Sequence, residues 1–76
     1  MKEFDPAEFS KRLRYLRKEK LKMTTHKFSA LIGIHVNTLR NYERQGYNPS
    51  AFTVYSICRA FGVSADWLLG FTEEEK

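Results

Sequence analysis

The chain has 76 residues, of which 42% are hydrophobic and 29% are charged, values that are ordinary for one folded domain with a modest core. Its single cysteine, Cys58, excludes an internal disulfide and any metal site built from several cysteines. The first residues, MKEFDPAEFSK, contain no apolar run, so we expect neither a signal peptide nor a membrane span. We therefore expect a cytoplasmic location.

The formal net charge of +4 is unevenly distributed along the chain. Residues 10–27 hold eight basic side chains and one acidic side chain, a net charge of +7, so the rest of the chain carries a net −3. A segment of this kind attracts a polyanion such as DNA, although the same pattern also describes a solvated helix face. Charge alone leaves both interpretations open.

The first predicted helix begins near residue 6. Asp5, Pro6 and Glu8 occupy the N-cap, first and third helical positions, a combination typical of a helix start. The side chains expected to point inward are Phe9, Leu13 and Leu16.

Residues 24–44 can hold two short helices separated by a tight turn, the layout of a helix-turn-helix. Thr24 is the expected N-cap of the first of these helices, and Gly33 can adopt the left-handed conformation that ends it. The spacing of Phe28, Leu31 and Ile32 predicts that all three are buried on one face, and Ile34 is expected to fill the turn.

The second helix of the pair is expected over about residues 36–44. Leu39 and Tyr42 are spaced to point inward, which leaves a short polar face on the other side. Asparagine can bind adenine, arginine can bind guanine, and a valine methyl can contact thymine in the major groove. The predicted base-reading residues are Val36, Asn37, Arg40 and Asn41.

Two further helices follow, which makes the predicted fold all-α with five helices. QGYNPS, with Gly46 and Pro49, is a turn, after which Ser50 caps a helix that ends at Gly62. Ser64 caps a last short helix before Gly70. The inward positions of these two helices are Val54, Ile57, Cys58, Phe61, Trp67 and Leu68.

From about Arg12 to Gly70 the chain resembles the Cro/cI-type helix-turn-helix family of phage repressors and small bacterial regulators, also called the xenobiotic-response-element family. The segments that together carry this resemblance are RLRYLR, LIGI, TLRNYE and GVSADWLLG. The resemblance implies a five-helix, lambda-repressor-like domain spanning residues 1–76. It also implies a regulator of transcription that binds double-stranded DNA. We expect no cofactor and a homodimer.

The sequence departs from the family pattern at three places. Thr25 stands where the family usually has a glutamine that often binds phosphate, so that contact is either weakened or passes to the hydroxyl and the backbone N–H. Ser29 replaces the usual alanine where the two helices cross. One extra residue is present near Leu21 and Lys22.

Arg17 and Glu43 match an ion pair between the first and third helices that the family often has, and the alternative is two exposed charges. His26 and His35 lie nine residues apart without carboxylate or cysteine partners, so we expect surface histidines and no metal site. His35 precedes the second helix of the pair, where it can meet a phosphate. The predicted phosphate contacts are Thr25, Lys27, His35, Thr38 and Arg44.

One recognition helix contacts too few base pairs to select a genomic site, so two copies are expected on a near-palindromic operator. Leu69 and Phe71 form an apolar cluster at the end of the last helix and are the predicted dimer contacts. The alternative is a protein-interaction module, such as an antitoxin-like partner on the same scaffold. The sequence has no paired-carboxylate site, no nucleophile beside a base and no phosphate-binding glycine loop, so we do not expect an enzyme.

Overall fold

In this computed structural model, the described residues, 3–45 and 47–75, form five α-helices and one π-helical segment. Their bounds are Pro6–Arg14 (α1), Tyr15–Lys20 (η1), Thr25–Ile32 (α2), Val36–Gln45 (α3), Ala51–Phe61 (α4) and Ala65–Leu68 (α5). The predicted all-α fold is confirmed, with η1 continuing α1. The predicted turn glycine, Gly46, lies outside the described residues.

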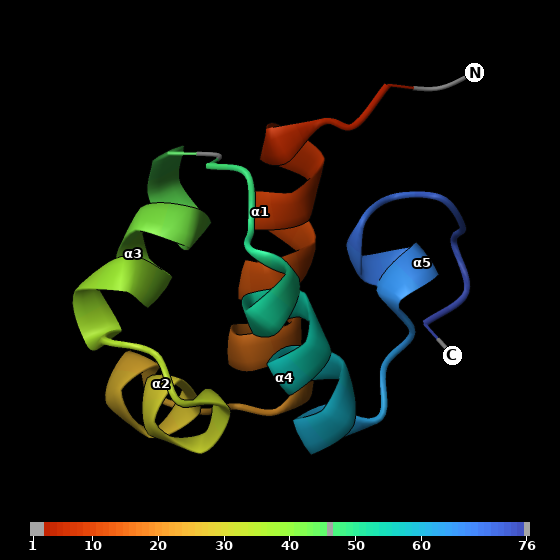
Figure 1. Ribbon diagram of the computed structural model, residues 1–76. Coiled ribbons are helices and arrows are strands. Elements are labelled where there is room, and N and C mark those ends of the chain that lie inside the picture. Colours follow the sequence, from red (N-terminus) through yellow and green to blue (C-terminus); the bar gives the residue numbers. More distant parts are fainter. Residues whose placement is uncertain (1–2, 46, 76) are drawn as a thin grey trace.

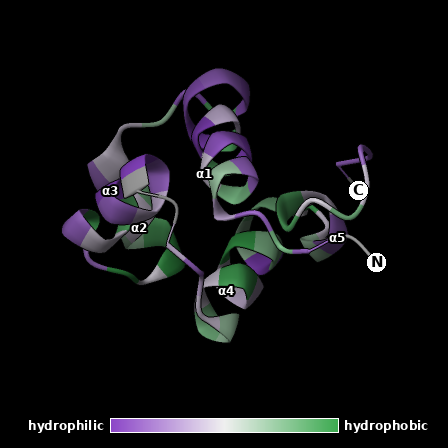
Figure 2. Ribbon diagram, turned by 90° about the horizontal axis from the view of Figure 1, so that it is seen from above, coloured by the Kyte–Doolittle hydropathy of each residue, from purple (hydrophilic) through white to green (hydrophobic). Residues whose placement is uncertain are grey.

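The helices contact one another in a closed ring around the core (Figure 1). α1 packs against α3, α3 against α2, α2 against α4, α4 against α5, and α5 against α1. Hydrophilic residues cover much of α1 and α3, whereas α4 is largely hydrophobic (Figure 2). Within the described part of the chain, no helix has the length and hydrophobicity that a membrane span requires.

Local sequence signals set where the helices begin and end. Asp5, Thr24, Ser50 and Ser64 each accept a hydrogen bond from a backbone N–H in the first turn of the following helix, at 3.0 to 3.1 Å. Gly33, with φ of 74°, ends α2, and Gly62, with φ of 70°, ends α4. These two glycines adopt a left-handed conformation that is costly for residues with a Cβ. The predicted caps are therefore confirmed.

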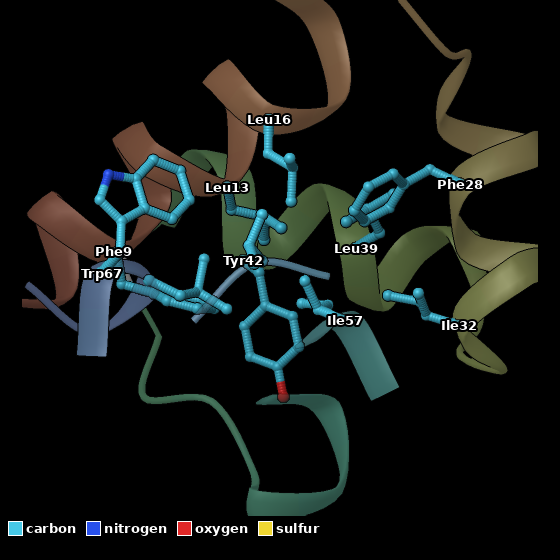
Figure 3. Packing of buried hydrophobic residues seen from close by; sticks show 11 residues of the cluster. Phe9, Leu13, Leu16, Phe28, Ile32, Leu39, Tyr42, Ile57 and Trp67 are labelled. Carbon is cyan, nitrogen blue, oxygen red and sulfur yellow. The ribbon is translucent and has the colours of Figure 1, made fainter. Parts of the chain in front are cut away.

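The core is built largely from the predicted inward positions of the helices (Figure 3). Phe9 of α1 and Tyr42 of α3 meet edge to face, with ring centroids 5.9 Å apart. Phe28 of α2 stacks on Phe61 of α4, with centroids 4.9 Å apart. The buried hydrophobic residues are Phe9, Leu13, Leu16, Phe28, Ile32, Leu39, Tyr42, Ile57, Val63, Trp67 and Leu68.

The prediction that Leu31 is buried was wrong, because its side chain is 53% exposed. Phe28, stacked on Phe61, fixes the rotation of α2 about its axis, and the inward positions are then Phe28, Ser29 and Ile32. Leu31 is left at the outer edge of the α2–α4 contact. Ser29 donates a hydrogen bond from its hydroxyl to the carbonyl of His26 (3.0 Å), which satisfies a buried polar group at the helix crossing.

The segment just before Leu21 and Lys22, near which one extra residue is predicted, adopts a π-helical conformation. The backbone N–H of Leu21 donates to the carbonyl of Leu16 at 2.9 Å, five residues earlier, whereas an α-helix would pair residues four apart. Lys22 follows with φ of 52°. A π-helical turn holds more residues than an α-helical turn, so this conformation is compatible with the predicted extra residue.

Candidate nucleic-acid interface

The N-terminus of α2 provides the first part of the candidate site. The hydroxyl of Thr24 accepts the N–H of Lys27, while Thr25 is half-buried at the first helical position and the Lys27 side chain is exposed. First-turn N–H groups point out of a helix N-terminus, where the helix dipole favours an anion. Thr25 and Lys27 therefore lie where a phosphate can be held.

The N-terminus of α3 is capped by His35. The Nδ1 atom of His35 accepts a hydrogen bond from the backbone N–H of Asn37 at 3.0 Å. A neutral imidazole whose Nδ1 is an acceptor carries its proton on Nε2, which is then a donor. His35 thus has a capping role in addition to the predicted phosphate contact, and its remaining nitrogen can donate to an acceptor.

The outward face of α3 carries the predicted base-reading residues. Asn37 and Arg40 are exposed one turn apart, and Nη1 of Arg40 lies 3.4 Å from Oδ1 of Asn37. Val36 and Asn41 are half-buried and lie at the flanks of this face. Thr38 and Arg44 are also exposed on α3. The structure therefore presents an amide and a guanidinium together on one helix face.

The inner side of α3 is anchored by an ion pair. Nε of Arg17 lies 2.7 Å from Oε2 of Glu43, and Nη2 of Arg17 lies 3.0 Å from Oε1, a bidentate arrangement. The side chains are 13% and 6% exposed, which argues against two separate surface charges. Nη1 of Arg17 also donates to the carbonyl of Met23 at 2.8 Å. Arg17 therefore connects α3 to the segment that leads into α2.

Two further side chains of α1 bind the backbone of α3. The Ser10 hydroxyl donates to the carbonyl of Tyr42, and Nη1 of Arg14 donates to the carbonyl of Glu43 at 3.4 Å. Carbonyls near a helix C-terminus have no partner within the helix, so donors from a neighbouring helix stabilise that end. These contacts hold α3 against α1 while its polar face remains exposed.

Three of the eight basic residues in residues 10–27 bind carboxylates of the same chain. Arg17 binds Glu43, Lys20 binds Glu75, and Arg12 binds Glu8 and Glu73. The net charge of this segment therefore overstates the charge that is available to DNA. The basic side chains that remain exposed there are Lys11, Arg14, Lys18, Lys22 and Lys27.

Arg12 is a structural residue whose role the sequence analysis did not predict. It is 7% exposed, and Nη1 donates to the carbonyls of Trp67 and Thr72, both at 2.6 Å. A hydrogen bond to the Glu8 carboxylate raises the pKa of Arg12, while burial acts in the opposite direction. The only local signal was the spacing of four residues between Glu8 and Arg12, which favours a helical ion pair.

The predicted dimer contacts differ in exposure. Phe71 is 71% exposed beyond α5. Leu69 is half-buried and packs partly against the core, so it is less exposed than the sequence indicated. Both line a hollow between the N-terminal segment and the end of α5.

Residues 13–68 match the sequence model of a family described as helix-turn-helix. The chain belongs to the Cro/cI-type helix-turn-helix family. Membership of this family supports DNA binding and a role in the regulation of transcription, in proteins that are typically not enzymes. A sequence comparison with curated proteins gives no match.

Three solved structures share the fold. The restriction-modification controller protein C.AhdI from Aeromonas hydrophila has a TM-score of 0.72 and 21% identity, over 83% of this chain and 94% of its own. The P22 c2 repressor, solved in complex with a synthetic operator, has a TM-score of 0.72 and 23% identity, over 84% and 96%. A transcriptional regulator from Listeria innocua has a TM-score of 0.73 and 23% identity, over 87% and 61%.

Proposed function

We propose that this chain is a sequence-specific regulator of transcription that works as a single domain in the cytoplasm, inserts α3 into the major groove and binds its operator as a homodimer. The outward face of α3 carries this proposal, because Asn37 and Arg40 are exposed side by side there. The bidentate ion pair between Arg17 and Glu43 anchors the inner side of the same helix. Readout of bases requires such polar side chains on a rigid helix.

Each residue of the outward face has a role that follows from its chemistry. The guanidinium of Arg40 can donate to both O6 and N7 of guanine, and the amides of Asn37 and Asn41 can bind N6 and N7 of adenine. The methyl groups of Val36 can contact the methyl group of thymine.

The phosphate contacts would come from both ends of the helix-turn-helix. Thr25 and Lys27 flank the N-terminus of α2, the Nε2–H of His35 is a donor at the N-terminus of α3, and Thr38 and Arg44 follow along α3. Contacts to phosphates set the register of the protein on the duplex without reading its sequence.

The homodimer follows from the length of the site. α3 has ten residues and can contact only a few base pairs, so two copies are needed for a selective site. Leu69 and Phe71 supply apolar surface for that contact. The operator is then a near-palindrome whose half-site centres lie about 10 base pairs apart, or a multiple of that spacing.

Selection of binding sites from random DNA, followed by mobility shifts with Arg40→Ala, tests the base-reading role. The variant should lose roughly 1 to 3 kcal/mol on the selected site and lose preference at one base position. Arg44→Ala is the matched control, because loss of a phosphate contact weakens binding to all sequences equally. An equal loss on all sequences for Arg40→Ala would refute base reading by this residue.

The salt dependence of binding tests the phosphate contacts. If about six phosphates are neutralised per dimer, the slope of log K against log salt should be about −5, because each contact contributes roughly −0.9. Lys27→Ala should flatten the slope and keep the sequence preference, whereas Lys18→Ala, on η1 and outside the predicted phosphate contacts, should change the slope less.

A protein-interaction module is the second candidate, and the exposed aromatic side chains of α4 and the chain end favour it. Phe52 and Tyr55 are each 58% exposed and Phe71 is 71% exposed. A mobility shift with random DNA, carried out in parallel with a pull-down, distinguishes the two functions. Absence of any shift, or a shift that does not respond to salt, would support the interaction module over the DNA-binding regulator.

A further inference from the structure

The outward face of α1 and η1 carries a line of basic side chains. Lys11, Arg14 and Lys18 are spaced by three and four residues, which places them on one face of a helix, and all three are exposed. They line the same hollow, with a volume of about 220 Å³, together with Tyr15 and Glu19. We call these three basic residues the α1 stripe.

α1 and η1 use their basic side chains in two ways. Arg12, Arg17 and Lys20 each form a salt bridge with a carboxylate of the same chain. Within the described part of the chain, no carboxylate forms a salt bridge with a residue of the α1 stripe. Its three cations and the one carboxylate of Glu19 give the wall of the hollow a net charge of +2. This charge is available to an anionic partner.

The α1 stripe adjoins the helix that carries the predicted base-reading residues. Nη1 of Arg14 donates to the carbonyl of Glu43 in the C-terminal half of α3, at 3.4 Å. Arg17, three residues after Arg14, binds the carboxylate of the same glutamate. α1 lies next to α3 and is mostly hydrophilic (Figure 2). DNA that holds α3 in its groove continues beyond the half-site, so its backbone can reach this neighbouring helix.

We propose that the α1 stripe binds the phosphates of the DNA that flanks the half-site on the same duplex. This inference rests on the proposed function, because it requires α3 to lie in the major groove. From Lys11 to Lys18 the helix rises roughly 10 Å. One DNA strand carries about three phosphates over that length, at one per ~3.4 Å. The number of cations in the stripe therefore matches the number of phosphates that they would face.

The composition of the hollow favours a DNA backbone over an acidic protein. Protein interfaces depend on a desolvated centre in which aromatic residues are common and lysine is rare. Tyr15, the aromatic residue in the wall of the hollow, is already engaged within the chain. Its hydroxyl donates to the carboxylate of Glu75 at 3.2 Å, and its ring lies 6.1 Å from that of Trp67. Basic side chains without an apolar centre suit phosphates, which contribute affinity independently of base sequence.

Binding to two duplexes of different length tests this contact. The short duplex contains only the selected site, and the long duplex adds about ten base pairs of arbitrary sequence at each end. The double variant Lys11→Gln/Lys18→Gln should bind the short duplex within about threefold of the parent, and the long duplex at least about tenfold more weakly at low salt. Each lost contact should flatten the slope of log K against log salt by roughly 0.9, on the long duplex alone. Lys18→Ala is therefore a control for Lys27→Ala on the short duplex.

Two control variants separate this contact from the general attraction of a longer polyanion. Lys11→Arg/Lys18→Arg keeps both charges and should bind each duplex as the parent does. Arg59→Gln removes an exposed charge from α4, where Nη1 of Arg59 donates to the Tyr55 hydroxyl at 2.6 Å, and should keep the parent's preference for the long duplex. Because the substituted side chains are exposed, all these variants should unfold at the temperature of the parent.

The other outcomes overturn the proposal in distinguishable ways. A double variant that keeps the parent's preference for the long duplex, or an Arg59→Gln variant that loses it equally, would show that the stripe does not contact the flank. A slower complex with two short duplexes, formed by the parent and lost in the double variant, would assign the stripe to a second duplex. A parent without any preference for the long duplex would leave the stripe to an acidic protein. In each of these cases selective binding to the short duplex remains, and the proposed function stands. If that binding is absent, the proposed function itself fails, and this inference fails with it.

Discussion

Two surfaces of the molecule are stabilised in different ways. One is formed by α2 and α3, and the other by α4, α5 and the chain ends. α3 presents polar side chains to solvent, and its inner side is fixed by buried Leu39 and Tyr42 and by the ion pair of Glu43 with Arg17. α5 has only four residues and little inner surface of its own. A helix that contacts bases requires contacts on its inner side that fix its position. The position of a short helix at an apolar surface depends on contacts made by the chain that follows it.

That following chain folds back along α1 and η1. Arg12 binds the carbonyl of Thr72 and the carboxylate of Glu73, and Lys20 binds the carboxylate of Glu75. The backbone carbonyl of Glu75 accepts the N–H of Ser64 at 2.8 Å, next to the start of α5. The acidic tail therefore joins the start of α5 to α1 and η1. Four substitutions probe the difference between the two surfaces.

The largest effect is expected for Arg17→Ala. This variant leaves the buried carboxylate of Glu43 without its counter-charge, and removing one partner of a buried pair costs about 3 to 5 kcal/mol. Urea unfolding at neutral pH measures the change in the free energy of unfolding. Arg14→Ala, whose hydrogen bond to the backbone of α3 is 3.4 Å long, is the matched control and should cost less than about 1 kcal/mol. Equal costs for the two variants would contradict the anchoring role of Arg17.

Phe71→Asp should change association and leave the fold intact. Because the side chain is largely exposed, the free energy of unfolding should change by no more than about 0.5 kcal/mol. Burial of a phenylalanine on association contributes roughly 1.5 to 3 kcal/mol, so cooperative binding to two half-sites should fall at least about tenfold. Phe52→Asp, on α4 and away from the hollow that Leu69 and Phe71 line, is the control. Footprints of Phe71→Asp that cover both half-sites as well as the parent would refute the predicted contact.

His35→Ala should cost about 1 kcal/mol of stability, because it removes the N-cap of α3. His35→Asn supplies another good capping side chain and should recover most of this loss. Neither variant retains the Nε2–H donor, so both should weaken DNA binding to a similar extent. Thermal unfolding and mobility shifts on one selected site separate the two roles, and an alanine variant as stable as the parent would exclude capping by His35.

The smallest effect is expected for the acidic tail. A hydrogen bond from Lys20 lowers the pKa of Glu75, so its contact stabilises the folded chain above the pKa that Glu75 has when unfolded, and this stabilisation is lost as the pH falls through the folded pKa. Glu75→Gln should therefore lower the unfolding temperature slightly at neutral pH and have no effect in acid. Glu74→Gln, at an exposed neighbouring position, should have no effect at either pH. A difference that persists in acid would exclude the ion pair as its cause.

Much of the candidate site could be predicted because it depends on short-range spacing. Asn37 and Arg40 lie three residues apart in a segment whose inward residues, Leu39 and Tyr42, are equally regular, so their exposure follows from the helical period. The bond between His35 and the backbone of Asn37 could not be predicted in the same way. Histidine is not a common capping residue, and only the geometry at the start of α3 reveals that its Nδ1 is an acceptor.

The error at Leu31 shows where helical spacing stops being sufficient. Apolar residues at i, i+3 and i+4 define the buried face of a helix only to within one residue on either side. The rotation of a helix as short as α2 about its own axis depends on the elements against which it packs. Here the stacking of Phe28 on Phe61 turned Ser29 inward and Leu31 outward. That contact joins residues 33 positions apart, and nothing in the sequence near α2 specifies it.

By itself the sequence determined the helix boundaries, the left-handed glycines and the family, because caps, glycine turns and apolar spacing act within a few residues of one another. Only the tertiary structure decided how the basic side chains are used. Arg12 and Lys20 meet carboxylates of the tail more than 50 residues away, and such pairs form only after the helices have brought the two ends of the chain together. The charge of a segment is a local property, whereas the charge that remains available to a partner depends on the whole fold.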